Sequence, residues 1–274
     1  MNLPLICLLS TVLVSQTQPP EELDVRKATL DAFLKDAQGY EMTWHGEKSA
    51  TLNLVPRSIL NWGSAERNDE NGAIFVWTRE GRPEVIGAIW SLYRKNTKQT
   101  VWRHGLQSLS EQPIIANFQS KLIWSPRSPG VRFQPLEGAE APANNPQRRL
   151  VQMRSLAREF SVEIDEPIGV TSQLRLLSQP IFRYEPSGDT NRDGAIFALN
   201  AGTDPDALLL LEARETDQQL QWEFAFGRLH FAEMRAVRHG QQAWKVDRDL
   251  ENRHHRFGTD PGREKIYYSV VRPR

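Results

Sequence analysis

Gly72-Ala-Ile-Phe75 is the stretch that decides the fold, because it occurs again as Gly194-Ala-Ile-Phe197, at a displacement of 122 residues (194 minus 72). Other large apolar residues recur at displacements of 120 or 122: Leu52 and Leu174, Trp62 and Tyr184, Trp102 and Trp222, Trp124 and Trp244. A register held over so many large side chains indicates two tandem copies of one supersecondary unit.

Each copy begins with a pattern typical of an amphipathic helix and continues with period-two alternation. In the first copy, acidic residues follow Pro19-Pro20, and Gly39 is a plausible stop signal. In the second copy, Asn145 can cap a helix and Pro146 suits its first position. The later runs, such as Ala73 to Trp77, alternate between turn-forming clusters, which is typical of antiparallel strands.

The repeat therefore predicts an α+β fold with two tandem homologous units, each an amphipathic helix packed on an antiparallel β-sheet. We place a signal peptide at residues 1–17, repeat unit 1 at 21–133, a linker at 134–147, and repeat unit 2 with a C-terminal extension at 148–274.

The start of the chain predicts export. Residues 3–14 form a charge-free apolar run of the length of a signal-peptide core, which is too short to span a bilayer. No other run approaches spanning length, so we predict a secreted, soluble protein, periplasmic or extracellular, without a membrane span. Lys plus Arg equals Asp plus Glu at 34 each, so no overall charge favours a nucleic-acid partner.

The second copy also contains sequence segments that resemble those of a protein family. Leu174-Arg-Leu-Leu177, Asp193-Gly-Ala-Ile-Phe197 and Gly202-Thr-Asp-Pro205 are similar to segments of exported bacterial proteins with no assigned activity. The resemblance implies export and brings no catalytic residue with it.

Positions at which the copies differ supply the candidate ligand-binding residues. Trp90 of the first copy becomes Glu212, Leu92 becomes Arg214, Trp77 becomes Leu199, Ser108 becomes Arg228, and His104 becomes Phe224. We therefore select as candidates Glu212, Arg214, Arg228, Trp77, Trp90 and His104. The favoured alternative for Glu212 and Arg214 is a solvated strand end or a mutual ion pair, and that for His104 is a core or edge position.

Metal and cofactor sites are not predicted. Asp189 to Gly194 matches the start of a calcium loop, but the last ligand position falls on Asn200 and the first copy has Arg67 at its first position. We interpret this string as a structural turn that ends in a hairpin glycine. His254, His255 and Asp260 lack the spacing of a zinc site.

The function that follows is a ligand-binding or protein-interaction module with an unknown ligand or protein partner. The alternative is a hydrolase whose site is assembled from scattered acidic residues and His104. No Gly-x-Ser-x-Gly or His-Glu-x-x-His motif occurs, so whether the protein is an enzyme stays open, with a binding role favoured. Sugar stacking on Trp44, Trp77 and Trp90 is a further possibility.

Overall fold

The computed structural model describes residues 20–45, 51–64, 70–166, 169–185, 193–216, 219–249 and 261–272. It is mostly β, with 54% of residues in strands and 14% in helices. The predicted α+β class, with a helix as a principal layer of each unit, is wrong. The long strands set the class, because they pair into large antiparallel sheets and the two helices are only accessory to them.

The described residues of the first unit form one helix and eight strands. In chain order they are α1 (Pro20–Gln38), β1 (Tyr40–Trp44), β2 (Asn53–Leu54), β3 (Leu60–Ser64), β4 (Glu70–Arg79), β5 (Arg82–Arg94), β6 (Gln99–Ser108), β7 (Ile114–Phe118) and β8 (Lys121–Trp124). β4, β5 and β6 form an antiparallel meander, and β1, β7 and β8 form a smaller sheet. A backbone hydrogen bond of 2.8 Å from Leu52 to Met42 connects the two sheets.

The second unit repeats this order. It follows β9 (Gln134–Pro135) and contains α2 (Pro146–Ala157), β10 (Phe160–Asp165), β11 (Thr171–Leu176), β12 (Phe182–Tyr184), β13 (Asp193–Asn200), β14 (Ala207–Thr216), β15 (Gln219–Arg228), β16 (Glu233–Arg238) and β17 (Gln241–Val246). The short 3-10 helix η2 (Pro261–Glu264) and strand β18 (Tyr267–Val271) end the described chain. α2 begins as predicted, since the Asn145 side chain accepts from the amides of Gln147 and Arg148.

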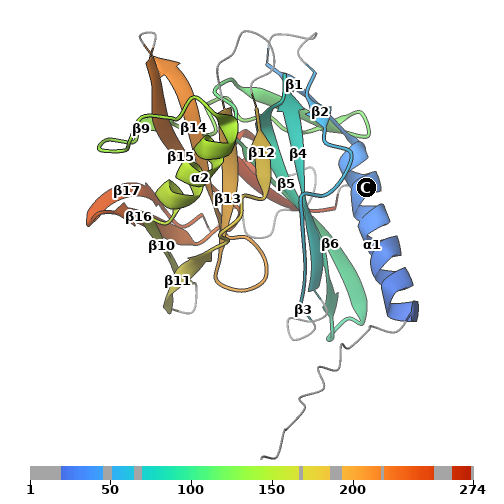
Figure 1. Ribbon diagram of the computed structural model, residues 1–274. Coiled ribbons are helices and arrows are strands. Elements are labelled where there is room, and N and C mark those ends of the chain that lie inside the picture. The colour runs from blue at the N-terminus through green and yellow to red at the C-terminus, as the bar shows by residue number, and fades with distance from the viewer. Residues whose placement is uncertain are drawn as a thin grey trace, which may run out of the picture.

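Both faces of the central strands are buried, which explains why most of their residues are apolar. In β4, Ala73, Phe75 and Trp77 face the core beneath α1, whereas Ile74 and Val76 face the other unit. The second unit uses the equivalent strands β13 to β15, whose outer residues pack against those of the first unit. The two sheets therefore lie back to back, with α1 and α2 on opposite sides of the molecule (Figure 1).

The repeated glycine lies inside a strand and supports an aromatic ring. Trp62 lies directly opposite Gly72, and Tyr184 lies directly opposite Gly194. A Cβ atom at Gly72 would come within 2.0 Å of the Trp62 ring, and one at Gly194 within 2.4 Å of the Tyr184 ring. The interpretation of this glycine as a hairpin-turn residue is therefore wrong. Glycine is required because only its bare backbone leaves room for the ring.

Each unit receives a strand that follows the other unit in the chain. β18, which follows the second unit, pairs with β6 of the first. β9, which follows the first unit and lies in the predicted linker, pairs with β15 of the second. This reciprocal exchange ties the two sheets together, so the C-terminal strand completes the first unit.

Candidate functional site

Glu212 lies at the contact between the two sheets and belongs to a buried charge cluster. The cluster consists of Arg82, Glu84, Glu111, Glu212, Arg214 and Glu223. β14 turns Glu212 toward the other unit because Leu210 and Leu208, two and four residues earlier, face that way. The Glu212 side chain has no exposed surface. The solvated strand end is therefore wrong for Glu212, whereas the other part of that alternative, a pair with Arg214, agrees with the 3.7 Å between the Arg214 Nε and the Glu212 carboxylate.

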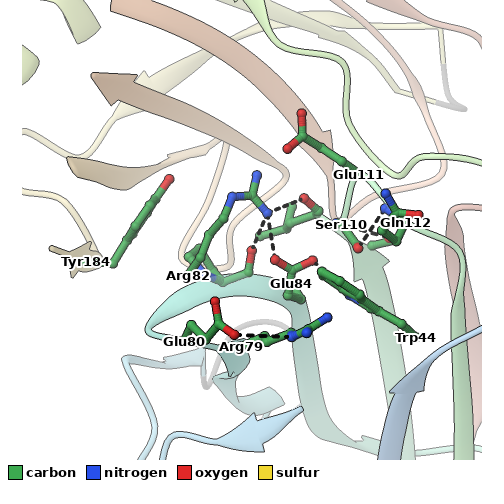
Figure 2. Close-up of polar contacts among 12 residues, drawn as sticks. Trp44, Arg79, Glu80, Arg82, Glu84, Ser110, Glu111, Gln112 and Tyr184 are labelled. Carbon is green, nitrogen blue, oxygen red and sulfur yellow. Dashed lines mark hydrogen bonds and ion pairs between the residues drawn. The ribbon is translucent and has the colours of Figure 1, made fainter. Parts of the chain in front are cut away.

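Arg82 provides the main counter-charge for Glu212, and it comes from the other unit. The Arg82 Nε lies 3.2 Å from the Glu212 carboxylate, which also accepts a hydrogen bond of 2.6 Å from the Tyr184 hydroxyl. The Arg82 guanidinium also donates to Glu84 at 3.0 Å. Figure 2 shows Arg82 extended between Tyr184 on one side and Glu84 with Trp44 on the other. Burial opposes the charge of Arg82, but Glu212 and Glu84 outweigh it and raise the arginine pKa.

Within the cluster, Arg214 pairs with the partly exposed side chain of Glu111. Its guanidinium donates to Glu111 at 3.0 and 3.1 Å and to Glu223 at 3.0 Å, and its Nε lies 3.7 Å from Glu212. The guanidinium carbon lies 4.8 Å from the centre of the Phe133 ring. Each acidic side chain of the cluster thus faces an arginine, which is the arrangement that offsets the cost of burying charge.

A cavity of about 1150 Å³ begins where this cluster reaches the surface, and we name it the edge cavity. Its polar lining residues are Gln107, Glu111, Ser128, Arg132, Gln134, Arg214, Glu215, Glu223, Arg228, Gln242 and Lys245. Its apolar lining includes Phe133, Phe226, Ala243, Trp244 and Val246. β15 and β17 stand far apart in the strand order, so a cavity lined by both shows that this sheet curves into a half-barrel whose open side is the cavity.

Arg228 lines the edge cavity and is held by the backbone. It donates to the carbonyl groups of His230, Asp247 and Ala232 at 2.6 to 2.9 Å. Within the described chain no carboxylate lies within ion-pair distance of its guanidinium. Burial is the largest influence on Arg228 and lowers its pKa.

The structure does not bring the six predicted site residues together. Arg214 and Arg228 line the edge cavity, and Glu212 lies behind Arg214. Trp77 is buried in the core of the first unit, and Trp90 packs against the contact between the two sheets. Neither Trp77 nor Trp90 is among the residues that line the edge cavity.

His104 lies in a buried chain of polar groups within the first unit. The Tyr40 hydroxyl is 2.7 Å from its Nδ1, and its Nε2 is 3.1 Å from the Asp36 carboxylate. A carboxylate only accepts, so Nε2 carries the proton and Nδ1 accepts from Tyr40. Arg272 completes the chain with a bond of 2.6 Å to Asp36. The His104 side chain has no exposed surface, so a substrate has no access to it in this structure.

The second unit shows that this polar chain is not needed to form the sheet. At the positions equivalent to Asp36, Tyr40 and His104 it has Leu156, Phe160 and Phe224, and the two phenylalanine rings lie 5.0 Å apart. In the first unit burial lowers the pKa of His104, and the neighbouring Asp36 opposes this shift only in part. Burial raises the pKa of Asp36, but hydrogen bonds from His104 and Arg272 outweigh it and lower the pKa.

Acidification is expected to destabilise the protein through His104. The unfolded chain binds a proton at this histidine near pH 6.5, whereas the folded protein binds it only at lower pH. The protein therefore loses stability as the pH falls from about 6.5, because the unfolded chain takes up the proton first. Asp36 adds to this loss only below its ordinary pKa of 3.8. The triple variant Asp36→Leu, Tyr40→Phe, His104→Phe should lose less stability between about pH 7 and 5. Urea denaturation at the two pH values measures this, and an equal loss in both proteins would contradict it.

The carboxylate of Asp193, in the calcium-like string, is paired with two arginine side chains. Its carboxylate accepts from Arg149 on one oxygen and from Arg183 on the other. Residues 189–192, His254, His255 and Asp260 lie outside the described residues. In the part that is described, no group of three or more His, Cys, Asp or Glu side chains is placed to hold a metal ion.

Sequence reasoning missed most of the cavity lining. The repeat matches Trp244 with Trp124, but Trp124 is fully buried whereas Trp244 is only half-buried. Arg132 and Phe133 follow β8, outside the repeat motif, so no comparison between copies could select them. No pattern in the sequence indicates that each unit pairs with a different additional strand, β18 in the first and β9 in the second.

No family model, no curated protein and no solved structure matches this chain. In the described chain no helix is long and apolar enough to cross a membrane. The site must therefore be interpreted from its own geometry and from the comparison of the two units.

Proposed function

We propose that this protein is an exported, non-enzymatic binding module that holds a small ligand in the edge cavity. The carrying observation is that the second unit is open at the place where the first unit is filled. The export part of the proposal is supported by the apolar run at residues 3–14, which lies outside the described residues.

In the first unit, β18 fills the space between β6 and β8. Tyr268 lies opposite Leu106, with 1% of its surface exposed. The segment that leads into β18 also reaches β8, where the Trp124 indole donates to the carbonyl of Lys265 at 2.7 Å. This space is therefore closed by a strand whose aromatic side chain enters the core.

In the second unit, the corresponding strand β9 pairs with β15 only at Glu223 and Phe224. Its register, continued by two residues, would place Arg132 opposite Phe226, the position that Tyr268 has opposite Leu106. Arg132 is exposed instead. The space that a buried tyrosine fills in one unit thus forms part of a cavity in the other.

The Gln107 side chain keeps this side open. Its amide nitrogen donates to the Gly130 carbonyl at 3.3 Å, and its oxygen accepts from the Arg228 amide at 3.4 Å. The side chain thus takes the place of a direct backbone bond between Gly130 and β15. A concave space with both apolar and polar lining can hold a small ligand, and this cavity has an aromatic wall beside many polar groups.

The proposal is tested with the neutral fluorescent probe N-phenyl-1-naphthylamine. We expect saturable binding to the wild-type protein and an affinity at least about tenfold lower in Arg132→Tyr, which restores the residue type of the first unit, and in Ala243→Trp, which adds an indole to the β17 wall. Arg94→Tyr, at an exposed position outside the cavity, is the matched control and should bind like wild type. Absence of saturable binding by wild type, or unchanged binding by both folded cavity variants, would overturn the proposal.

A further inference from the structure

The apolar wall of the edge cavity contains two stacked aromatic rings, Phe226 and Trp244. Phe226 and Trp244 stack with ring centres 5.2 Å apart and planes inclined by 17°. Their equivalents in the first unit, Leu106 and Trp124, belong to the same core cluster as Tyr268. The Trp244 indole nitrogen has no hydrogen-bond acceptor among the described residues, whereas the Trp124 nitrogen has the Lys265 carbonyl. A ring placed here would therefore gain stacking and could gain one donor.

Four cationic side chains line the edge cavity, Arg132, Arg214, Arg228 and Lys245, together with three carboxylates, Glu111, Glu215 and Glu223. Arg214 is matched by Glu111 and Glu223, and Lys245 by Glu233 and Asp247 outside the cavity. Glu215 is exposed and interacts with another group.

Arg132 and Arg228 are the two lining cations with no carboxylate within ion-pair distance in the described structure. Asp249 and Asp247 lie near enough to oppose the lowering of the Arg228 pKa by burial. The three carbonyl bonds of Arg228 use three of the five N–H groups of a guanidinium. Arg228 is only 5% exposed, and a buried cation is stabilised by an anion that approaches it. Arg132 is exposed at the same cavity and can contact an anion without loss of any partner.

We propose that the ligand of the edge cavity is an aromatic anion, with its ring against Phe226 and Trp244 and its carboxylate or sulfonate group facing Arg132 and Arg228. This inference rests on the proposed binding function and adds the ligand class. Charge-assisted bonds from arginine are the strongest neutral-pH contacts that the cavity offers an anion.

The test compares two probes that differ by one anionic group. 1-Anilinonaphthalene-8-sulfonate carries a sulfonate, whereas N-phenyl-1-naphthylamine has the same rings without it. Wild type should bind the sulfonate at least about tenfold more tightly, and Arg132→Glu should remove this preference while it changes the affinity for the neutral probe less than about twofold. Arg94→Glu makes the same charge change outside the cavity and should leave both affinities unchanged. Arg228 is not substituted, because three carbonyl groups would lose their donor.

The outcomes separate the two proposals. If neither probe binds wild type, the binding function itself fails. If both probes bind equally well, and Arg132→Glu alters neither, the cavity is a binding site but the anionic class is wrong. If Arg132→Glu and Arg94→Glu weaken binding of the sulfonate probe equally, the preference arises from the overall charge of the protein. That result would also contradict the assignment of an anionic ligand to this cavity.

Discussion

Replacement of Arg82 by alanine is expected to lower the free energy of unfolding by about 3–5 kcal/mol. The reason is that Glu212 has no exposed surface and Arg82 is the guanidinium nearest to it, at 3.2 Å. Arg214, at 3.7 Å, is already shared with Glu111 and Glu223. Loss of Arg82 leaves a carboxylate buried at the contact between the two units without its main counter-charge.

Denaturant unfolding of Arg82→Ala measures this effect, with Arg235→Ala as the control. The Arg235 pair with Glu163 is exposed, at 43% and 45% of the two side chains, so solvent screens it and its loss should change stability little. A loss in Arg82→Ala no larger than in the control would show that the cluster does not hold the units together.

The second large effect is expected from Gly72→Ala, with a loss of about 3 kcal/mol or more, at the upper end for overpacked cores. The new methyl group would lie 2.0 Å from the Trp62 ring, so the ring must leave its place between the sheets. Gly105→Ala is the matched control, because its methyl group would meet Trp90 at an ordinary 3.4 Å. Thermal or urea unfolding compares the two. Equal stability of both variants would contradict the account of the repeated glycine.

The repeat made much of the local structure predictable. The two copies of Gly-Ala-Ile-Phe lie in β4 and β13, and Asn145 caps α2, because strand alternation and capping depend on neighbouring residues. The fold class was misjudged because two helical segments were given the weight of full layers. Propensity and period identify an element, but the share of each layer depends on how the strands pair.

The candidate site was predictable only in part. Comparison of the copies selected Arg214 and Arg228, which line the cavity, and Glu212, which lies behind Arg214, but not the partners of these residues. Arg82 reaches Glu212 from the other unit, and Arg132 reaches the cavity from the connection after β8. Both contacts arise from the back-to-back sheets and the exchanged strands, which are long-range features without a local pattern.

The central claim is that the second unit binds a ligand where the first unit is closed, and the two equivalent tryptophans test it most directly. In a ¹H–¹⁵N spectrum of the protein titrated with 1-anilinonaphthalene-8-sulfonate, the indole N–H signal of Trp244 should shift in proportion to bound probe. The Trp124 signal, whose N–H is bonded to the Lys265 carbonyl, should stay in place. Assignment follows from Trp244→Phe and Trp124→Phe. A stationary Trp244 signal while probe binds, or equal shifts of both signals, would contradict the claim.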